Sequence, residues 1–249
     1  MNIVVILRAV KDPAGLTVNR KAQKVFVNRE QYLFNPSDRN ALEAGLRLGG
    51  RVTVVALGGA PAEQVLRDAR AMGAAQAIRL PDAALQRADA GVLTAVFSRL
   101  LDRLGGADLV LAGAECLDAD LAQVAPRLAQ ALQRPFIGQA HQLSVTEGTL
   151  SVVAAHGRGF RRLEADLPAV VAVAVDSNKP RYAPGQNLIN IFTDPAAVET
   201  LTAADLELGE AELTPVVELR GEAFPPEREP GKRLDGDVVG QLVDLIRRA

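Results

Sequence analysis

The stretch best suited to chemistry is a glycine and two acids that follow an apolar run. The run is Leu109–Ala112, it breaks at Gly113, and Asp118 and Asp120 stand in the loop that follows. A glycine lets another group approach the backbone closely, and the free N–H groups at the start of a helix attract anions. The pattern predicts a strand, a loop that could hold a phosphate or adenosine group, and a helix. The two acids could instead simply cap that helix.

A second polar segment, Asn35–Asp38 (N-P-S-D), also stands directly before a helical pattern. Ser37 could cap this helix after Pro36, which makes the segment a turn and a cap. The segment could also form a polar edge of the same crevice, because open parallel sheets bind ligands where their strands end. The residues alone leave both interpretations open.

The remaining reactive residues form no catalytic series. Gly58–Pro61 (G-G-A-P) lacks the full G-x-G-x-x-G spacing of a dinucleotide site, so a tight turn explains it better. The sequence has no G-x-x-x-x-G-K-[ST] phosphate loop. Cys116, His141 and His156 are far apart in sequence, which argues against a zinc site. We therefore expect neither a metal ion nor catalytic residues.

Short apolar runs alternate with helical patterns through the first half of the chain. Runs of β-branched residues without alternation are typical of strands that are buried on both faces. The expected strands are Asn2–Leu7, Arg51–Leu57, Ala77–Leu80, Leu109–Ala112 and Ala169–Val175. The expected helices are Ala41–Leu48, Pro61–Met72, Ala88–Leu104 and Leu121–Gln133. This order predicts an α/β fold in three layers, with a parallel sheet between two layers of helices.

Other segments alternate in the manner of antiparallel strands. Gln142–Val145 and Leu150–Ala155 flank a turn, and Arg161–Asp166 could add a third strand. Near the beginning of the chain, Lys24–Asn28 and Gln31–Phe34 also flank a turn and could pair as a hairpin. We expect the first group to form an antiparallel addition to the parallel sheet.

The chain becomes irregular after Asp176. Ala203–Glu229 carries eight acids against two arginines and is followed or interrupted by prolines, which predicts an extended arm outside the core. Asp235–Ala249 shows the pattern of an amphipathic helix. The expected organisation is a nucleotide-binding α/β domain over residues 1–176 and an arm with a terminal helix over residues 177–249.

Composition limits the classes of partner. Hydrophobic residues make up 48% of the 249 residues, which is ordinary for a globular protein, and a formal net charge of −2 gives no reason to expect nucleic acid. The sequence has no apolar run near the roughly 18 residues of a membrane span and no basic, apolar-cored leader. We expect a cytoplasmic protein that does not insert into membranes.

Six motifs, in this order, resemble the β subunits of electron transfer flavoproteins, including FixA-like members. They are V-V-I-L-R-A-V-K (Val4–Lys11), N-P-S-D with A-L-E-A-G-L-R-L (Asn35–Leu48), L-R-D-A-R-A-M-G-A (Leu66–Ala74), D-L-V-L-A-G with D-A-D-L-A-Q-V-A-P (Asp108–Pro126), L-P-A-V-V (Leu167–Val171) and N-K-P-R-Y-A (Asn178–Ala183). Each motif is weak by itself, but together they cover nearly the whole chain.

The resemblance implies half of a flavin-carrying heterodimer, an electron carrier without its own substrate turnover. An α subunit would hold most of a redox-active FAD, and this chain would cover the FAD and bury its own nucleotide, usually AMP. Electrons would pass from a flavin dehydrogenase to a quinone reductase or another acceptor, and the C-terminal arm would wrap the α subunit. The implied pocket residues are Ala9, Asn35, Pro36, Ser37, Asp38, Leu57, Gly113, Ala114, Glu115, Cys116, Leu117, Asp118, Ala119, Asp120, Leu121, Ala122, Gln123 and Val124.

Departures from the family pattern bear on the cofactor and on the redox partner. The usual N-Q-T-G reads A-Q-V-A at Ala122–Ala125, closer to the branch with nitrogen-fixation-associated and electron-bifurcating members, in which a second FAD can replace AMP. Ser37 replaces an aromatic residue, Gly185 replaces an anchoring leucine, Arg161 replaces a glutamate, and Ile189–Asp194 lacks the expected lysines. These differences predict a redox partner other than the usual acyl-CoA dehydrogenases.

Two other classes compete with the electron carrier. A stand-alone regulatory module that binds adenine nucleotides would need no partner, but it would have no evident use for the arm after Asp176. A hydrolase or ligase of nucleotides is disfavoured by the missing phosphate loop and the missing catalytic series.

Overall fold

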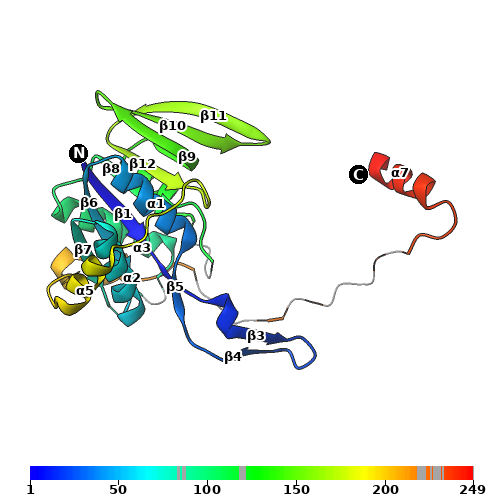
Figure 1. Ribbon diagram of the computed structural model, residues 1–249, viewed down its shortest axis with the longest axis horizontal. Coiled ribbons are helices and arrows are strands. Elements are labelled where there is room, and N and C mark those ends of the chain that lie inside the picture. The colour runs from blue at the N-terminus through cyan, green and yellow to red at the C-terminus, as the bar shows by residue number, and fades with distance from the viewer. Residues whose placement is uncertain are drawn as a thin grey trace.

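The fold is a nine-stranded sheet between two layers of helices (Figure 1). The computed structural model describes residues 1–82, 85, 88–117, 122–217, 223–224, 226, 231 and 233–248. The strand order is β11-β10-β9-β12-β8-β1-β6-β7-β13. The strands that pair in parallel are β1 (Asn2–Leu7), β6 (Arg51–Leu57), β7 (Gln76–Leu80), β8 (Leu109–Gly113), β9 (Phe136–Thr146), β12 (Ala169–Val173) and β13 (Glu199–Thr200).

Successive residues of β1 point to opposite faces of the sheet, and each face carries its own core. Ile3, Val5 and Leu7 pack against α1 (Pro36–Arg47) and α2 (Ala60–Met72). Val4 and Ile6 pack against α3 (Ala90–Arg103) and α4 (Val124–Ala131). Apolar residues at every position are what a strand buried on both faces requires. The predicted three-layer α/β fold is confirmed.

The predicted antiparallel addition is confirmed. β9 runs parallel to β12 at its start and then pairs with β10 (Thr149–His156), which pairs in turn with β11 (Gly159–Asp166). Along β10, buried and half-buried residues alternate, so one face of this extension packs on the core.

The hairpin predicted between Lys24–Asn28 and Gln31–Phe34 is wrong. β4 (Lys24–Val27) pairs with β3 (Leu16–Asn19), and β5 (Tyr32–Phe34) pairs with β2 (Ala9–Lys11). The Gly15 carbonyl, next to the short 3-10 turn η1 (Pro13–Gly15), accepts hydrogen bonds from the N–H groups of Asn28 and Arg29 and so returns the chain to its upstream partner. The β3–β4 ribbon projects from the body (Figure 1).

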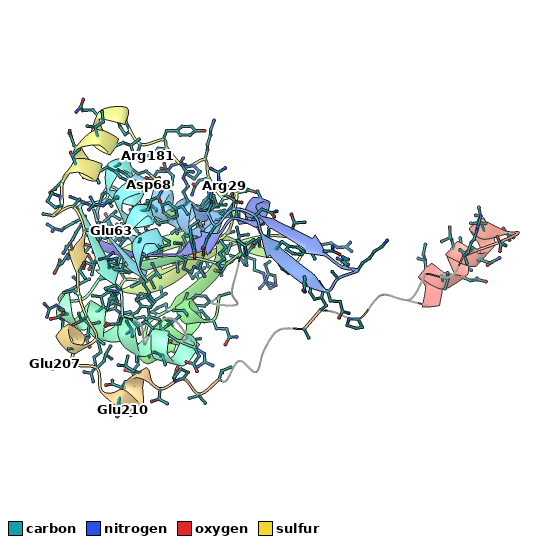
Figure 2. The ribbon with its side chains drawn as sticks, turned by 90° about the horizontal axis from the view of Figure 1, so that it is seen from below. Arg29, Glu63, Asp68, Arg181, Glu207 and Glu210 are labelled. Carbon is teal, nitrogen blue, oxygen red and sulfur yellow. The ribbon has the colours of Figure 1, made fainter. Side chains whose placement is uncertain are left out.

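After β12 the chain first packs along the α/β domain, and only its last helix lies apart from that domain. α5 (Gly185–Thr193) packs on α2, β13 adds to the edge strand β7, and η3 (Ala204–Leu206) and α6 (Glu210–Leu213) pack on α3. Figure 2 accordingly shows Glu207 and Glu210 across the body from Arg181 and Asp68.

This course corrects the expectation for Ala203–Glu229. Leu206 is buried in the core on the α3 face, so the first part of that segment is not an extended arm. Its apolar residues are few but fill space beside α3. α7 (Val238–Arg248) lies apart from the body (Figure 1) and exposes its apolar residues Val239, Leu242 and Ile246.

The carboxylate of Asp89 ties the segment around Val216 to the start of α3. Asp89 Oδ1 accepts from the N–H groups of Gly91 and Val92 at the start of α3, and Oδ2 accepts from those of Val216 and Val217. These hydrogen bonds, led by the one from Val92, lower the pKa of Asp89.

We expect Asp89→Ala to lower the free energy of unfolding by about 1 kcal/mol, because α3 loses its N-cap. Protease cleavage near Val216 should also become faster, since two backbone tethers are lost. Urea unfolding and limited proteolysis measure the two effects. Asp89→Asn, which keeps one side-chain oxygen, should lose less stability than Asp89→Ala, and equal losses would contradict the cap.

Candidate functional site

The candidate site lies where the strand order reverses. From β1 the chain goes to β6 and β7 on one side, and then returns to β8 on the other side of β1. Connections therefore leave the ends of β1 and β8 in opposite directions, and ligands of open α/β sheets bind at such a switch point. Gly113, at the end of β8, stands at this position.

The start of α1 clamps the chain where it leaves β8. The Gly113 N–H donates to Asp38 Oδ1 at 3.0 Å, and the Glu115 N–H donates to Ser37 Oγ at 3.3 Å. Asn35 Nδ2 donates to the Glu115 carbonyl at 2.8 Å. The structure thus brings together the two polar segments that the sequence singled out.

Ser37 is not the cap of α1, contrary to one sequence interpretation. The helix begins at Pro36 with Asn35 in the N-cap position, and the side chain of Asn35 makes no capping bond. Ser37 Oγ instead donates to the Val173 carbonyl at 2.9 Å, since its side chain points into the junction of β8 and β12. Both side chains serve long-range contacts in place of the local cap that the sequence suggested.

Gly113 is needed for a close approach, but the approaching group is α1. A Cβ at this position would lie 2.5 Å from Ser37 Oγ and 2.7 Å from the Asp38 nitrogen, and closer still to Asp38 Oδ1. Any larger residue must push the helix start away from the sheet. The clash explains this glycine without a ligand.

Arg8 organises the site and was missed by sequence reasoning. Its Nε and Nη2 donate to Asp38 Oδ2 at 2.9 Å and Oδ1 at 2.5 Å, and Nη2 also reaches the carbonyls of Gly113 at 3.1 Å and Glu115 at 3.0 Å. Asp38 is fully buried, so the arginine compensates its charge. The only signal in the sequence was a basic residue directly after the first buried strand.

The other implied pocket residues spread along the same edge of the sheet or lie outside the described residues. Ala9 begins β2 just after β1, and Leu57 ends β6, the neighbour of β1. Ala114, Glu115, Cys116 and Leu117 continue from β8, and Leu117 is exposed. Ala122, Gln123 and Val124 lead into α4. Asp118, Ala119, Asp120 and Leu121 lie outside the described residues. α4 begins at Val124 with Gln123 in its N-cap position, so neither acid is the N-cap residue that the sequence suggested.

Three helices begin at this edge without side-chain caps. α1, α2 and α4 have Asn35, Gly59 and Gln123 in their N-cap positions. Gly59 has no side chain, and the side chains of Asn35 and Gln123 make no capping bond, whereas Asp89 caps α3. Uncapped helix starts offer N–H groups and the positive end of the helix dipole. The edge therefore suits an anionic group such as a phosphate. Within the described ranges, His, Cys, Asp and Glu form no group of three that could hold a metal ion.

A second clamp ties the segment after β12 to α1. Asn40 Nδ2 donates to the Asn178 carbonyl at 2.7 Å, and Arg181 Nε donates to Glu43 Oε2 at 2.8 Å. Glu43 is buried, and Arg47 Nε donates to its other oxygen at 2.6 Å. Burial alone would raise the pKa of Glu43, but the hydrogen bonds from Arg181 and Arg47 together lower it below its usual 4.5.

This clamp predicts a pH dependence of stability. A carboxylate with a lowered pKa in the folded chain contributes stability above its usual pKa and loses it as the pH falls through the folded value. We expect Glu43→Gln to cost about 1 kcal/mol at pH 7, because both arginines are half exposed, and to cost less in acid. Urea unfolding of the unchanged chain and of Glu43→Gln, from pH 7 down into the acid range, measures this cost. A cost that does not change with pH would contradict the lowered pKa of Glu43.

Two comparisons with known proteins identify the family of this chain. The model of the electron transfer flavoprotein domain matches residues 23–206. The chain belongs to the electron transfer flavoprotein β subunit family. It is 31% identical to the electron transfer flavoprotein subunit beta of Thermoanaerobacterium thermosaccharolyticum, over 100% of this chain and 97% of the relative.

Other relatives carry the same or a different name. The Clostridium acetobutylicum subunit beta is 30% identical over 98% of this chain and 92% of the relative. Protein FixA of Sinorhizobium fredii is 29% identical over 73% of this chain and 67% of the relative.

None of the helices in the described part of the chain is long and apolar enough to cross a membrane.

Proposed function

We propose that this chain pairs with an α subunit to form a heterodimeric electron transfer flavoprotein. The α subunit holds most of the FAD, which carries electrons from a dehydrogenase to a downstream acceptor. The chain itself contributes a covering surface and a structural nucleotide, AMP, at the switch point. Family membership supports the electron-transfer role, and the names of its relatives as subunits support a partner chain.

The observation that carries the nucleotide site is the convergence at the end of β8. There, Asn35, Ser37 and Asp38 hold Gly113 and Glu115 in place, so the loop to α4 starts from a fixed backbone. The start of α4 and the neighbouring starts of α1 and α2 favour a phosphate. Because the side chains of Asn35, Ser37 and Asp38 are bonded to the protein, they support the pocket, and nucleotide contacts fall to the loop and to the edge formed by Ala9 and Leu57.

A second FAD in place of AMP is the alternative. It is favoured by Val124, which stands where the common family form carries a threonine hydroxyl, and by the similarity to FixA. Val124 is buried among the apolar residues of the α3 and α4 face. Its side chain therefore supplies no hydrogen bond to a ligand.

Apolar residues that the described chain leaves exposed on α7 support the proposal of a partner subunit. α7 presents Val239, Leu245 and Ile246 to solvent, each more than half exposed. An amphipathic helix with an exposed apolar stripe gains stability when another chain covers it. We infer that α7 and the residues that lead to it wrap the α subunit, as an arm distinct from the α/β domain.

Co-expression with a candidate α subunit tests the proposal. The expected result is a one-to-one complex with flavin absorbance that the chain alone lacks, and loss of the complex when residues 233–249 are deleted. A chain that never associates with an α subunit and binds AMP as a monomer would instead support a stand-alone regulatory module.

A further inference from the structure

We propose that Arg8 is a positioning residue for the nucleotide pocket: it fixes the direction in which the chain leaves β8 and so sets how slowly the nucleotide is released. This proposal rests on the proposed nucleotide site. Arg8 immediately follows β1, while the loop that it holds follows β8, so one side chain spans the two strands of the switch point.

The Arg8 guanidinium joins three groups that no other described side chain joins. Its hydrogen bonds reach both oxygens of Asp38 and the carbonyls of Gly113 and Glu115. Asp38 in turn holds the Gly113 N–H. Gly113 is thus held through both its N–H and its carbonyl, and the side chain of Asp38 is held against the start of α1.

The same network also fixes Glu115, two residues after β8. Glu115 is held by Arg8 and Asn35 through its carbonyl and by Ser37 through its N–H. Two residues later Leu117 is 54% exposed. Arg8 therefore acts on the backbone directly before Cys116 and Leu117, where a small change in direction moves these residues of the proposed pocket.

Arginine is required for this task, and lysine would not replace it. The planar guanidinium presents several N–H groups in a fixed fork, whereas the lysine ammonium is a single charge on a flexible stem. Arg8→Lys can keep the ion pair with Asp38, so the buried carboxylate stays compensated. It cannot span the carboxylate and both carbonyls at the same time.

The experiment measures AMP release from full-length Arg8→Lys, with a chase of excess AMP after loading with labelled AMP. We expect release at least tenfold faster than from the unchanged chain. The unfolding midpoint of the refolded, nucleotide-free chain should fall only slightly, because the ion pair with Asp38 is kept while hydrogen bonds to the carbonyls are lost. Added AMP should raise that midpoint less in Arg8→Lys, because the stabilisation that a ligand gives grows with the logarithm of its affinity for the folded chain.

Arg67→Lys is a matched control. Arg67 also bridges a carboxylate, Glu63 (labelled in Figure 2), and two carbonyls, those of Ile191 at 2.7 Å and Asp194 at 2.8 Å, but it lies between α2 and α5. We expect AMP release from this variant at the unchanged rate. Equal acceleration in both variants would overturn the specific role of Arg8.

A charge-neutral variant keeps the test decisive if Arg8→Lys is unstable. Arg8→Met with Asp38→Asn removes both charges, so neither is left uncompensated, and it should release AMP as fast as Arg8→Lys. Release at the unchanged rate from either variant would overturn the proposal and leave the nucleotide site standing. An unchanged chain that binds neither AMP nor FAD, alone or with its α subunit, would instead remove the proposed site itself.

Discussion

Replacing Asp38 by alanine is expected to lower the free energy of unfolding by about 3–5 kcal/mol, the usual cost of breaking a buried ion pair. Asp38 is fully buried, and the side chain of Arg8 is only 14% exposed. The substitution leaves the guanidinium without its counter-charge and the Gly113 N–H without its acceptor. Urea unfolding of the purified chain measures the loss.

Two controls separate the causes of that loss. Asp38→Asn keeps an oxygen for the Gly113 N–H and should lose less stability than Asp38→Ala. Glu63→Ala removes a carboxylate that also pairs with two arginines, Arg67 and Arg79, but is 32% exposed, so it should cost about 1 kcal/mol or less. Equal losses of stability for Asp38→Ala and Glu63→Ala would show that burying the Arg8–Asp38 pair does not make it contribute more than an exposed pair.

Gly113→Ala is expected to destabilise the chain by about 3 kcal/mol, the upper end for overpacking, because part of the obstacle is backbone. The added methyl group would meet Ser37 Oγ and the Asp38 nitrogen at 2.5 and 2.7 Å. The helix start must move, and the clamp on Glu115 loosens with it. Thermal or urea unfolding measures the change.

Gly185→Ala is the control for this substitution, since a Cβ there meets no heavy atom within 4 Å. It should change stability by about 0.5 kcal/mol or less. A similar small effect at Gly113 would mean that α1 does not approach β8 as closely as the structure shows. The clash at Gly113 is with α1 of the same chain, so Gly113→Ala could lose nucleotide only because α1 has moved. Such a loss would not locate the pocket. Arg8→Lys adds no such clash and therefore tests the pocket more directly.

Local pattern was enough to predict the layers, and it offered the meeting of the two polar segments as one of two interpretations. β1 is apolar at every position from Ile3 to Leu7, and β6 is apolar from Val54 to Leu57, because both faces are covered; this shows directly in the sequence. The convergence of Asn35–Asp38 with Gly113 does not follow from the parallel sheet alone. Asn35–Asp38 comes after β5, and the antiparallel pairing of β5 with β2 brings it back to the end of β1 beside β8.

What escaped prediction depends on contacts between distant residues. Arg8 and Glu115 are 107 positions apart, and Glu43 and Arg181 are 138 apart, so neither pair leaves a local signature. β13 has two residues and η3 has three, too short for any periodicity. The true partner of β4 depends on the Gly15 carbonyl, which side-chain patterns do not reveal.

The most direct test of the central claim is to count the nucleotides released from the chain, purified alone and as a complex with its α subunit. Mass spectrometry identifies them, and absorbance gives the number per complex. The account predicts AMP from the chain alone and one FAD with one AMP from the heterodimer. Two FAD per heterodimer would identify the alternative, with flavin in the switch-point pocket. A complex that contains no nucleotide beyond the FAD of the α subunit would contradict the account.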